Sequence, residues 1–238
     1  MSLRESLPEK LRGFLRGSRA AGQGAAPRSA ASFRNHAGRS DAAGEKVSIR
    51  HSRGMEQFFG YIRDQFGLTI LDLGGAYQEN VSFITGLGHR LYSEDMLTIL
   101  QETFGVDDFT DQSNPSRIEY FLRQSLDYQD EQFDGVLIWD ALEFMAPPLL
   151  SATIDRLYRI VKPRSYLLAF FHSQDRPGTV PYYTFRIQDF NSLQVTEYGA
   201  HQPAQLFNNR TLEKMFQKYE SVKFFLTREH LREVIIKR

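Results

Sequence analysis

The chain has 238 residues, 41% of them apolar, and its 29 basic and 29 acidic residues balance. A chain of this length can form one sizeable core with an additional tail. The balanced charge gives no reason to expect a specific nucleic-acid partner. The absence of cysteine excludes disulfides, thiolate nucleophiles and cysteine metal ligands, and the scattered histidines form no metal-binding pattern. No apolar run approaches the roughly 18 residues of a membrane span, so we expect a cytoplasmic protein without a metal site.

The N-terminal part of the sequence differs from the remainder. Residues 1–50 carry six more basic than acidic side chains, and the rest carries the opposite excess. Leucine and phenylalanine at helical spacing over 3–15 predict a short basic amphipathic helix, which can contact an unknown partner or an anionic surface. A weakly formed, solvated helix is the alternative. We predict a basic, largely disordered arm over 1–46 and an ordered domain over 47–238.

Helix and strand patterns alternate in the ordered part. Apolar periodicity predicts helices at 55–66, 79–87 and 96–104, a helix after the proline pair 147–148, and one capped by Asn209 or Thr211. Strands are expected at 68–73, 89–93, 118–122, 133–139, 166–171, 222–226 and 234–236. The alternation predicts an α/β fold with a Rossmann-like doubly wound, mostly parallel seven-stranded sheet that ends in a C-terminal antiparallel hairpin.

The alternation stops over residues 174–207, which are rich in proline and aromatic residues. Tyr182, Tyr183, Phe185 and Phe190 all fall in this stretch. A long segment without regular structure inside a domain is often a lid or binding loop. We therefore expect an irregular aromatic lid here.

The segment 69–76, Thr-Ile-Leu-Asp-Leu-Gly-Gly-Ala, combines an apolar run, an acidic residue and a small-residue turn. This is the pattern of a buried strand that ends beside a ligand pocket in an open α/β sheet. Gly74 and Gly75 let the backbone turn sharply and let a ligand approach it. The pattern does not satisfy the Gly-x-Gly-x-x-Gly fingerprint, and no phosphate loop or Gly-x-Ser-x-Gly elbow occurs, so a nicotinamide cofactor and an α/β-hydrolase are not expected.

Three stretches together resemble a protein family. They are Leu71–Ala76, Phe133–Phe144, and Arg159–Pro163 before the strand at 166–171. Their order and spacing are similar to those of class I S-adenosyl-L-methionine (SAM)-dependent methyltransferases of the type 11 kind, over residues 47–238. The resemblance implies SAM as cofactor and a small-molecule methyl acceptor.

The resemblance also assigns roles to strand-end carboxylates. It places Asp72 where an acidic residue positions the methionine amino group, and Glu94 where one receives the ribose hydroxyls, with Asp95 as the competing register. A carboxylate suits the ribose because it accepts from two hydroxyls at once. The structural alternatives are that Asp72 caps the following helix and that Glu94 is an exposed strand-end charge. The other cofactor contacts that the resemblance implies are Gly74, Gly75, Ala76, Gln124, Ser125, Trp139 and Asp140.

His172, which follows the strand at 166–171, is a candidate general base near the acceptor, and a structural role is the alternative. Trp139 is either pocket wall or core. The family loop reads Asp-x-Gly-x-Gly-x-Gly, whereas its later glycines here fall on Ala76 and Gln78. Phe144 stands where the family has histidine.

We expect SAM-dependent methyl transfer to a small or medium-sized acceptor, with the lid closing over it. The alternative is a catalytically weak or inactive methyltransferase-like protein that binds or regulates, a reading that Gln78 and Phe144 favour.

Overall fold

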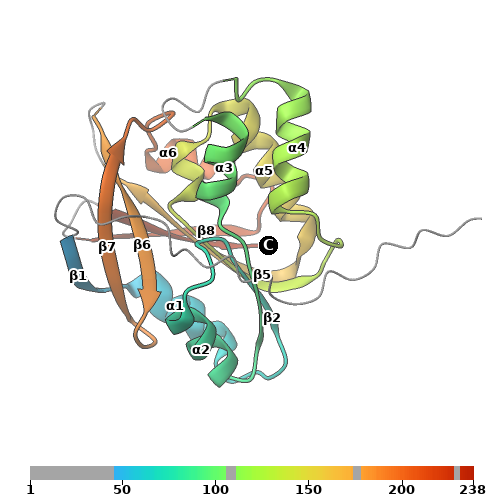
Figure 1. The fold of residues 1–238 in the computed structure, drawn as a ribbon. Helices are drawn as coiled ribbons and strands as arrows, with labels where there is room; N and C mark the ends of the chain where they lie inside the picture. The colour runs from blue at the N-terminus through green and yellow to red at the C-terminus, as the bar shows by residue number, and fades with distance from the viewer. Residues whose placement is uncertain (1–45, 106–110, 174–177, 228–230) are drawn as a thin grey trace, which may run out of the picture. The chain divides into compact units, whose positions relative to one another are not determined.

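Two β-sheets organise the part of the chain that the computed structural model describes, residues 46–105, 111–173, 178–227 and 231–238. One sheet has six strands in the order β3-β2-β4-β5-β9-β8, and the other has three in the order β1-β7-β6 (Figure 1). The predicted arm and its helix at 3–15 lie outside the described residues, except that Lys46 already begins strand β1 (Lys46–His51).

The six-stranded sheet is mostly parallel. Its strands are β2 (Thr69–Asp72), β3 (Arg90–Ser93), β4 (Phe133–Trp139), β5 (Val161–His172), β8 (Ser221–Leu226) and β9 (Leu231–Lys237). Strands β3, β2, β4 and β5 run parallel, whereas β9 is antiparallel to β5 and β8 is antiparallel to β9. The predicted α/β class and C-terminal hairpin are confirmed, with six strands in this sheet rather than seven.

The missing strand is the one expected at 118–122, and that prediction was wrong. These residues lie inside helix α4 (Pro115–Ser125). The Asn114 side chain accepts hydrogen bonds from the backbone N–H groups at the start of this helix, and Pro115 occupies its first turn, where proline is tolerated. Ile118, Phe121 and Leu122 pack against the core at helical spacing, a period that the short apolar run concealed.

Helices cover both faces of the six-stranded sheet. Helices α3 (Met96–Phe104), α4 and α5 (Pro147–Ile160) pack on one face, and α1 (Arg53–Ile62) and α2 (Gln78–Gly86) lie on the other, with the small sheet (Figure 1). Successive strand residues alternate between the two cores, as Ile70 and Leu71 do in β2. Helix α3 matches its predicted range, whereas α1 ends at Ile62, four residues early.

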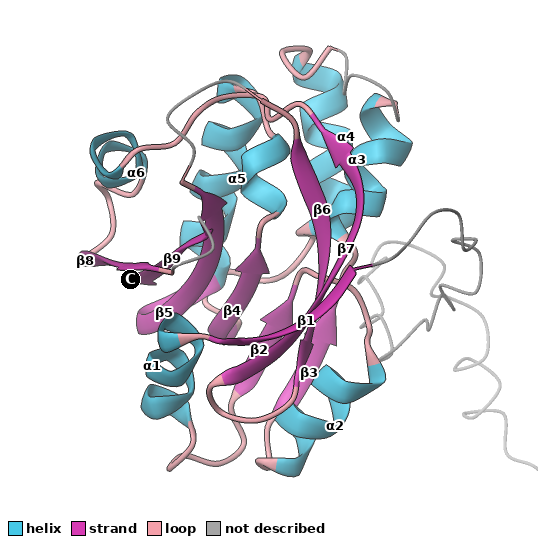
Figure 2. Cartoon of the chain, turned by 90° about the vertical axis from the view of Figure 1, so that its left-hand side faces the viewer, coloured by secondary structure: helices cyan, strands magenta, loops and turns pink. Residues whose placement is uncertain are grey.

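Residues 178–207 are more regular than expected. Strand β6 (Val180–Ile187) pairs with β7 (Ser192–His201), and β7 pairs with β1, all antiparallel (Figure 2). Alternate side chains of β6, Tyr183 and Phe185 among them, are buried against the six-stranded sheet. The prediction of an irregular segment was therefore wrong, because the abundance of aromatic residues and prolines masked this alternation. A short helix, α6 (Asn209–Met215), follows, and its cap is Asn208 rather than Asn209 or Thr211.

Candidate functional site

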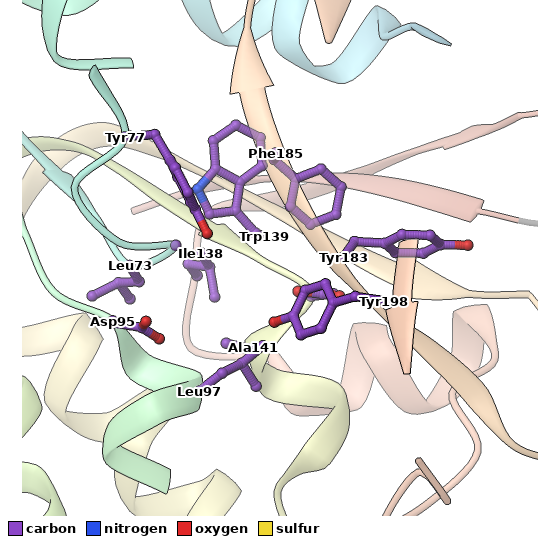
Figure 3. Close-up of a pocket in the computed structure, with 12 residues that line it drawn as sticks. Leu73, Tyr77, Asp95, Leu97, Ile138, Trp139, Ala141, Tyr183, Phe185 and Tyr198 are labelled. Carbon is purple, nitrogen blue, oxygen red and sulfur yellow. The ribbon is translucent and has the colours of Figure 1, made fainter. Parts of the chain in front are cut away.

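A crevice lies at the carboxyl ends of β2 and β4. The chain passes from β2 to β3 on one side and then crosses to β4 on the other, so the strand order reverses here. Open α/β sheets bind their ligands at this kind of reversal. The crevice is lined by Leu73, Gly74, Tyr77, Asp95, Leu97, Ile138, Trp139, Asp140, Ala141, Tyr183, Phe185 and Tyr198 (Figure 3).

Aromatic side chains close the crevice almost completely. Tyr183 and Phe185 reach into it from β6 and Tyr198 from β7, and Trp139 and Tyr77 cover the side of the β2 turn (Figure 3). The remaining cavity volume is about 10 Å³. That is room for about one water molecule, and far less than a drug-sized ligand occupies.

Asp72 is fully buried beneath this crevice and is held by three donors. Its Oδ1 accepts hydrogen bonds from Trp139 Nε1 at 2.6 Å and from the Gly74 backbone N–H at 2.9 Å. Its Oδ2 accepts from Asn80 Nδ2 at 2.9 Å. Burial raises the pKa of the Asp72 carboxyl to about 6, although these hydrogen bonds favour the charged form.

The indole of Trp139 fills the space directly above the β2 turn. A Cβ at position 74 would lie 2.5 Å from Cδ1 of the indole, so Gly74 lacks a side chain where this ring packs. The indole also stacks on Phe185, with ring centroids 5.0 Å apart and planes within 6°. The backbone φ of Trp139 is +59°, a conformation that costs a bulky residue about 1–3 kcal/mol.

Asn80 connects the β2 turn to the small sheet. It is fully buried in the first turn of α2, and its amide donates to Asp72 and to the carbonyl oxygen of Phe185 at 3.1 Å. Its oxygen accepts from the backbone N–H of Ile187 at 2.8 Å. One side chain therefore holds β6, and with it the ring of Phe185, over the end of β2. Asn80 was not recognised in the sequence, where a polar residue near a helix start is an ordinary feature.

The two acidic residues after β3, Glu94 and Asp95, have different hydrogen-bond partners. Glu94 Oε1 accepts from the Tyr128 hydroxyl at 2.7 Å, and the Glu94 carbonyl accepts from the N–H of Gly75 at 3.1 Å. Asp95 lines the crevice, and its carboxylate caps α3 by accepting from the backbone and hydroxyl of Thr98, each at 2.8 Å. Gly75 has a φ of +100°, which explains the glycine at this position.

Of the cofactor contacts that the resemblance implies, Gly74, Asp95, Trp139 and Asp140 line the crevice, whereas Asp72, Gly75, Ala76, Glu94, Gln124 and Ser125 do not. Ala76 and Gln78 are exposed, and the Gln78 side chain hydrogen-bonds with Ser82 along α2, away from the crevice. Gln124 and Ser125 lie on α4, where the Ser125 hydroxyl donates to a carbonyl of its own helix. The cofactor roles that the resemblance gives to Ala76, Gln124 and Ser125 stay predictions.

Three buried ionisable side chains cluster beside the crevice. His172 Nδ1 lies 2.6 Å from Glu143 Oε2, and the His172 backbone N–H donates to the same carboxylate at 3.1 Å. Asp140 is 2% exposed, and burial raises its pKa to about 7, with the neighbouring His172 opposing and Glu143 reinforcing the rise. Among the described residues, neither Asp140 Oδ2 nor His172 Nε2 has a hydrogen-bond partner. Glu143 is the residue of this cluster that the sequence did not single out, although it belongs to a stretch that resembles the family.

Within the described residues, no group of three or more potential ligands is placed to hold a metal ion, and no helix is long and apolar enough to cross a membrane.

No protein-family model and no curated protein matches the sequence. Solved structures similar to this one include a SAM-dependent methyltransferase from Archaeoglobus fulgidus, at 17% identity and a TM-score of 0.44, covering 77% of this chain and 92% of that one. Another is a SAM-dependent methyltransferase from Aquifex aeolicus, at 12% identity and a TM-score of 0.42, covering 76% and 88%.

A third similar structure is a Burkholderia thailandensis 1,6-didemethyltoxoflavin-N1-methyltransferase with bound 1,6-didemethyltoxoflavin and S-adenosylhomocysteine. Its identity is 12% and its TM-score is 0.43, and the match covers 78% of this chain and 76% of that one. All three are methyltransferases, the class that the sequence resembles. With TM-scores below 0.5, these similarities assign neither a ligand nor a reaction to this chain.

The crevice offers SAM a suitable set of acceptors but insufficient space. Asp72 and the Glu94–Asp95 pair supply carboxylates at the ends of β2 and β3, and the turn at Gly74 keeps its backbone free of a side chain. The indole of Trp139 occupies the place above that turn and donates to Oδ1 of Asp72, the carboxylate to which the resemblance assigns the methionine amino group. The cofactor therefore does not fit this arrangement unless the indole and the aromatic side chains of β6 and β7 move apart.

Proposed function

We propose that this chain binds SAM in the crevice and transfers its methyl group to a small or medium-sized acceptor. One observation supports this most strongly. The crevice lies at the reversal of strand order, and carboxylates follow all three strands around it, at Asp72, Asp95 and Asp140. Two of the three motif stretches of the sequence, Leu71–Ala76 and Phe133–Phe144, contribute residues to the lining of this crevice.

Each of these groups has a task in the proposal. Asp72 would accept from the methionine amino group, the carboxylates of Glu94 or Asp95 would accept from the ribose, and the backbone at Gly74 would contact the methionine. SAM itself supplies an electrophilic methyl group. The indole of Trp139 has to leave Asp72 before the amino group can take its place.

The buried cluster beside the crevice suits proton removal from the acceptor. When the His172 proton is on Nδ1, it donates to Glu143 and leaves Nε2 as an acceptor. Glu143 then holds the ring in one orientation, as the second residue of a carboxylate–histidine pair does. His172 would be the general base, and Glu143 would be its positioning residue.

A second candidate function follows from Trp139. Its indole N–H already occupies the acceptor that the cofactor needs, and its ring fills the required volume. A chain that keeps this arrangement permanently would be a methyltransferase-like binding or regulatory module without SAM.

One titration separates the two candidates, because Trp139 is the only tryptophan in the chain. S-adenosylhomocysteine, the demethylated product, would be added to the full-length protein while tryptophan emission and binding heat are recorded. The methyltransferase proposal expects saturable heat together with a red-shifted emission as the indole leaves its buried place. Trp139→Phe, which keeps a ring but frees Asp72, should bind about tenfold more tightly, the value of one charge-assisted hydrogen bond. No heat at millimolar ligand in either protein would exclude SAM-dependent catalysis and leave the module.

A further inference from the structure

A second cavity, of about 380 Å³, lies between the small sheet, the start of α1 and the strands β8 and β9. This volume is within the range of small-molecule sites, and it equals that of about a dozen water molecules in the liquid. Within the part of the chain that the structure describes, no residue lines both this cavity and the crevice discussed above. A ligand of the second cavity is therefore independent of the proposed methyl transfer.

Apolar side chains form both the floor and the rim of the second cavity. The floor consists of the buried side chains of Phe170 from β5, Leu193 and Val195 from β7, and Leu231 from β9. At the rim, Ile49 is 64% exposed and Leu226 is 71% exposed. Large apolar side chains that stay exposed around a hollow indicate a surface that an apolar group covers.

Two polar side chains that line the cavity, Arg50 and Thr227, are engaged within the protein. The Arg50 guanidinium lies 5.2 Å from the centroid of the Tyr183 ring, and its Nε donates to the Ser48 hydroxyl at 3.3 Å. The Thr227 hydroxyl donates to the carbonyl oxygen of Leu231 at 2.7 Å. Neither side chain depends on a ligand for its partners.

The buried carboxyl of the cavity, Glu233, is committed to the start of α1. It is 2% exposed, and its Oε2 accepts from the Gly54 backbone N–H at 2.5 Å. Burial raises the pKa of this carboxyl, against its hydrogen bonds with Gly54 and Ser52. His51 and Arg53 also line the cavity but are exposed, so water and salt screen their charges. An ion that entered the cavity would therefore lose hydration without gaining a buried counter-charge from these residues.

We propose that this second cavity binds an uncharged, mainly apolar molecule of about a dozen non-hydrogen atoms. Its hydrocarbon part contacts Phe170, Leu193 and Val195 at the floor and covers Ile49 and Leu226 at the rim. Burial of this apolar surface provides the affinity. A neutral polar group of the ligand, such as a hydroxyl, stays at the exposed rim and keeps its contact with water.

Isothermal titration calorimetry with the full-length protein tests the class of ligand. The probe is 1-naphthalenemethanol, and its charged counterparts of similar size are 1-naphthoate and 1-naphthylmethylamine. The alcohol should give saturable heat. Each ion should bind at least about tenfold more weakly, because the cavity does not offset the lost hydration of a charge.

Two residues on the exposed side of β1 provide a matched pair of variants. Ile49 lines the cavity, whereas Val47, which is 55% exposed, does not. Ile49→Ser removes an apolar contact and should weaken binding of the alcohol about fourfold, the value of one buried methylene group. Val47→Ser should leave the affinity unchanged.

A third variant tests the location. The extra atoms of Val195→Phe would enter the cavity, so this variant should abolish binding of the alcohol. The proposal fails if the alcohol shows no saturable heat at millimolar concentration, or if either ion binds as well as the alcohol. It also fails if Val47→Ser weakens binding as much as Ile49→Ser. A folded Val195→Phe protein with unchanged affinity would overturn the location; should this variant not fold, the two variants of β1 decide.

Discussion

Asp140→Asn should make the protein more stable at neutral and alkaline pH. The carboxyl of Asp140 has an ordinary value of 3.8, and burial raises its pKa to about 7 in the folded chain. Between these values the unfolded chain has released this proton and the folded chain still holds it, so stability falls as pH rises. A pKa shift of about three units corresponds to about 4 kcal/mol of unfolding free energy. The wild type has lost all of this stability above pH 7 and none of it below pH 4. Asparagine is neutral at every pH and abolishes this loss.

Urea denaturation at pH 5 and pH 8 measures the effect. The variant should exceed the wild type by about 3–4 kcal/mol at pH 8, but by only about 1–2 kcal/mol at pH 5, where part of the loss has already occurred. Asp64→Asn is the control, because this carboxyl is exposed and should leave the pH dependence unchanged. If Asp140→Asn and the wild type have the same stability at both pH values, the Asp140 carboxyl does not have a raised pKa in the folded protein.

Three further predictions concern the crevice. The backbone φ of residue 139 is +59°, so the Trp139→Gly protein should be about 1 kcal/mol more stable than Trp139→Ala, the reverse of the usual order. Chemical denaturation of the two variants measures this difference. A more stable Trp139→Ala protein would contradict the backbone strain. Asn80→Ala should lower the unfolding free energy by about 2–4 kcal/mol, because Asp72 and the β6 backbone lose buried partners. Gln78→Ala, at an exposed position on the same helix, should change it by less than about 0.5 kcal/mol. Equal effects of the two variants would mean that Asn80 does not hold β6. With any acceptor that supports turnover, His172→Gln should lower kcat by about 10²–10⁴-fold with little change in KM. Glu143→Gln should lower kcat by a smaller factor. An unchanged kcat in His172→Gln would exclude His172 as the general base.

Much of the fold was predictable because strand and helix periods are local. The strands at 69–72 and 133–139 and the helix at 96–104 have strong apolar patterns, and the structure places them as expected. The error at 118–122 arose because five residues are too few to distinguish the two periods, so the asparagine–proline cap at 114–115 was the better signal. In β6, the alternation around Phe185 was present but was outweighed by its aromatic and proline-rich context.

The candidate site was predictable only in part. Asp72 and Asp140 could be found because an acidic residue after an apolar strand is a local pattern. The closure of the crevice could not, since it depends on contacts between segments far apart in sequence, such as Trp139 with Asp72 and Asn80 with Phe185. Gln78 drew attention as a departure from the family loop, yet its side chain lies outside the crevice, and Trp139 is the residue that occupies it.

A crystal structure of the full-length protein soaked with S-adenosylhomocysteine tests most directly whether the crevice is a cofactor site closed by Trp139. The proposal predicts ligand density over residues 72–78, with the methionine amino group on Asp72 and the indole withdrawn from it. Empty density over this turn at saturating ligand, with Trp139 Nε1 still 2.6 Å from Asp72 Oδ1, would contradict it.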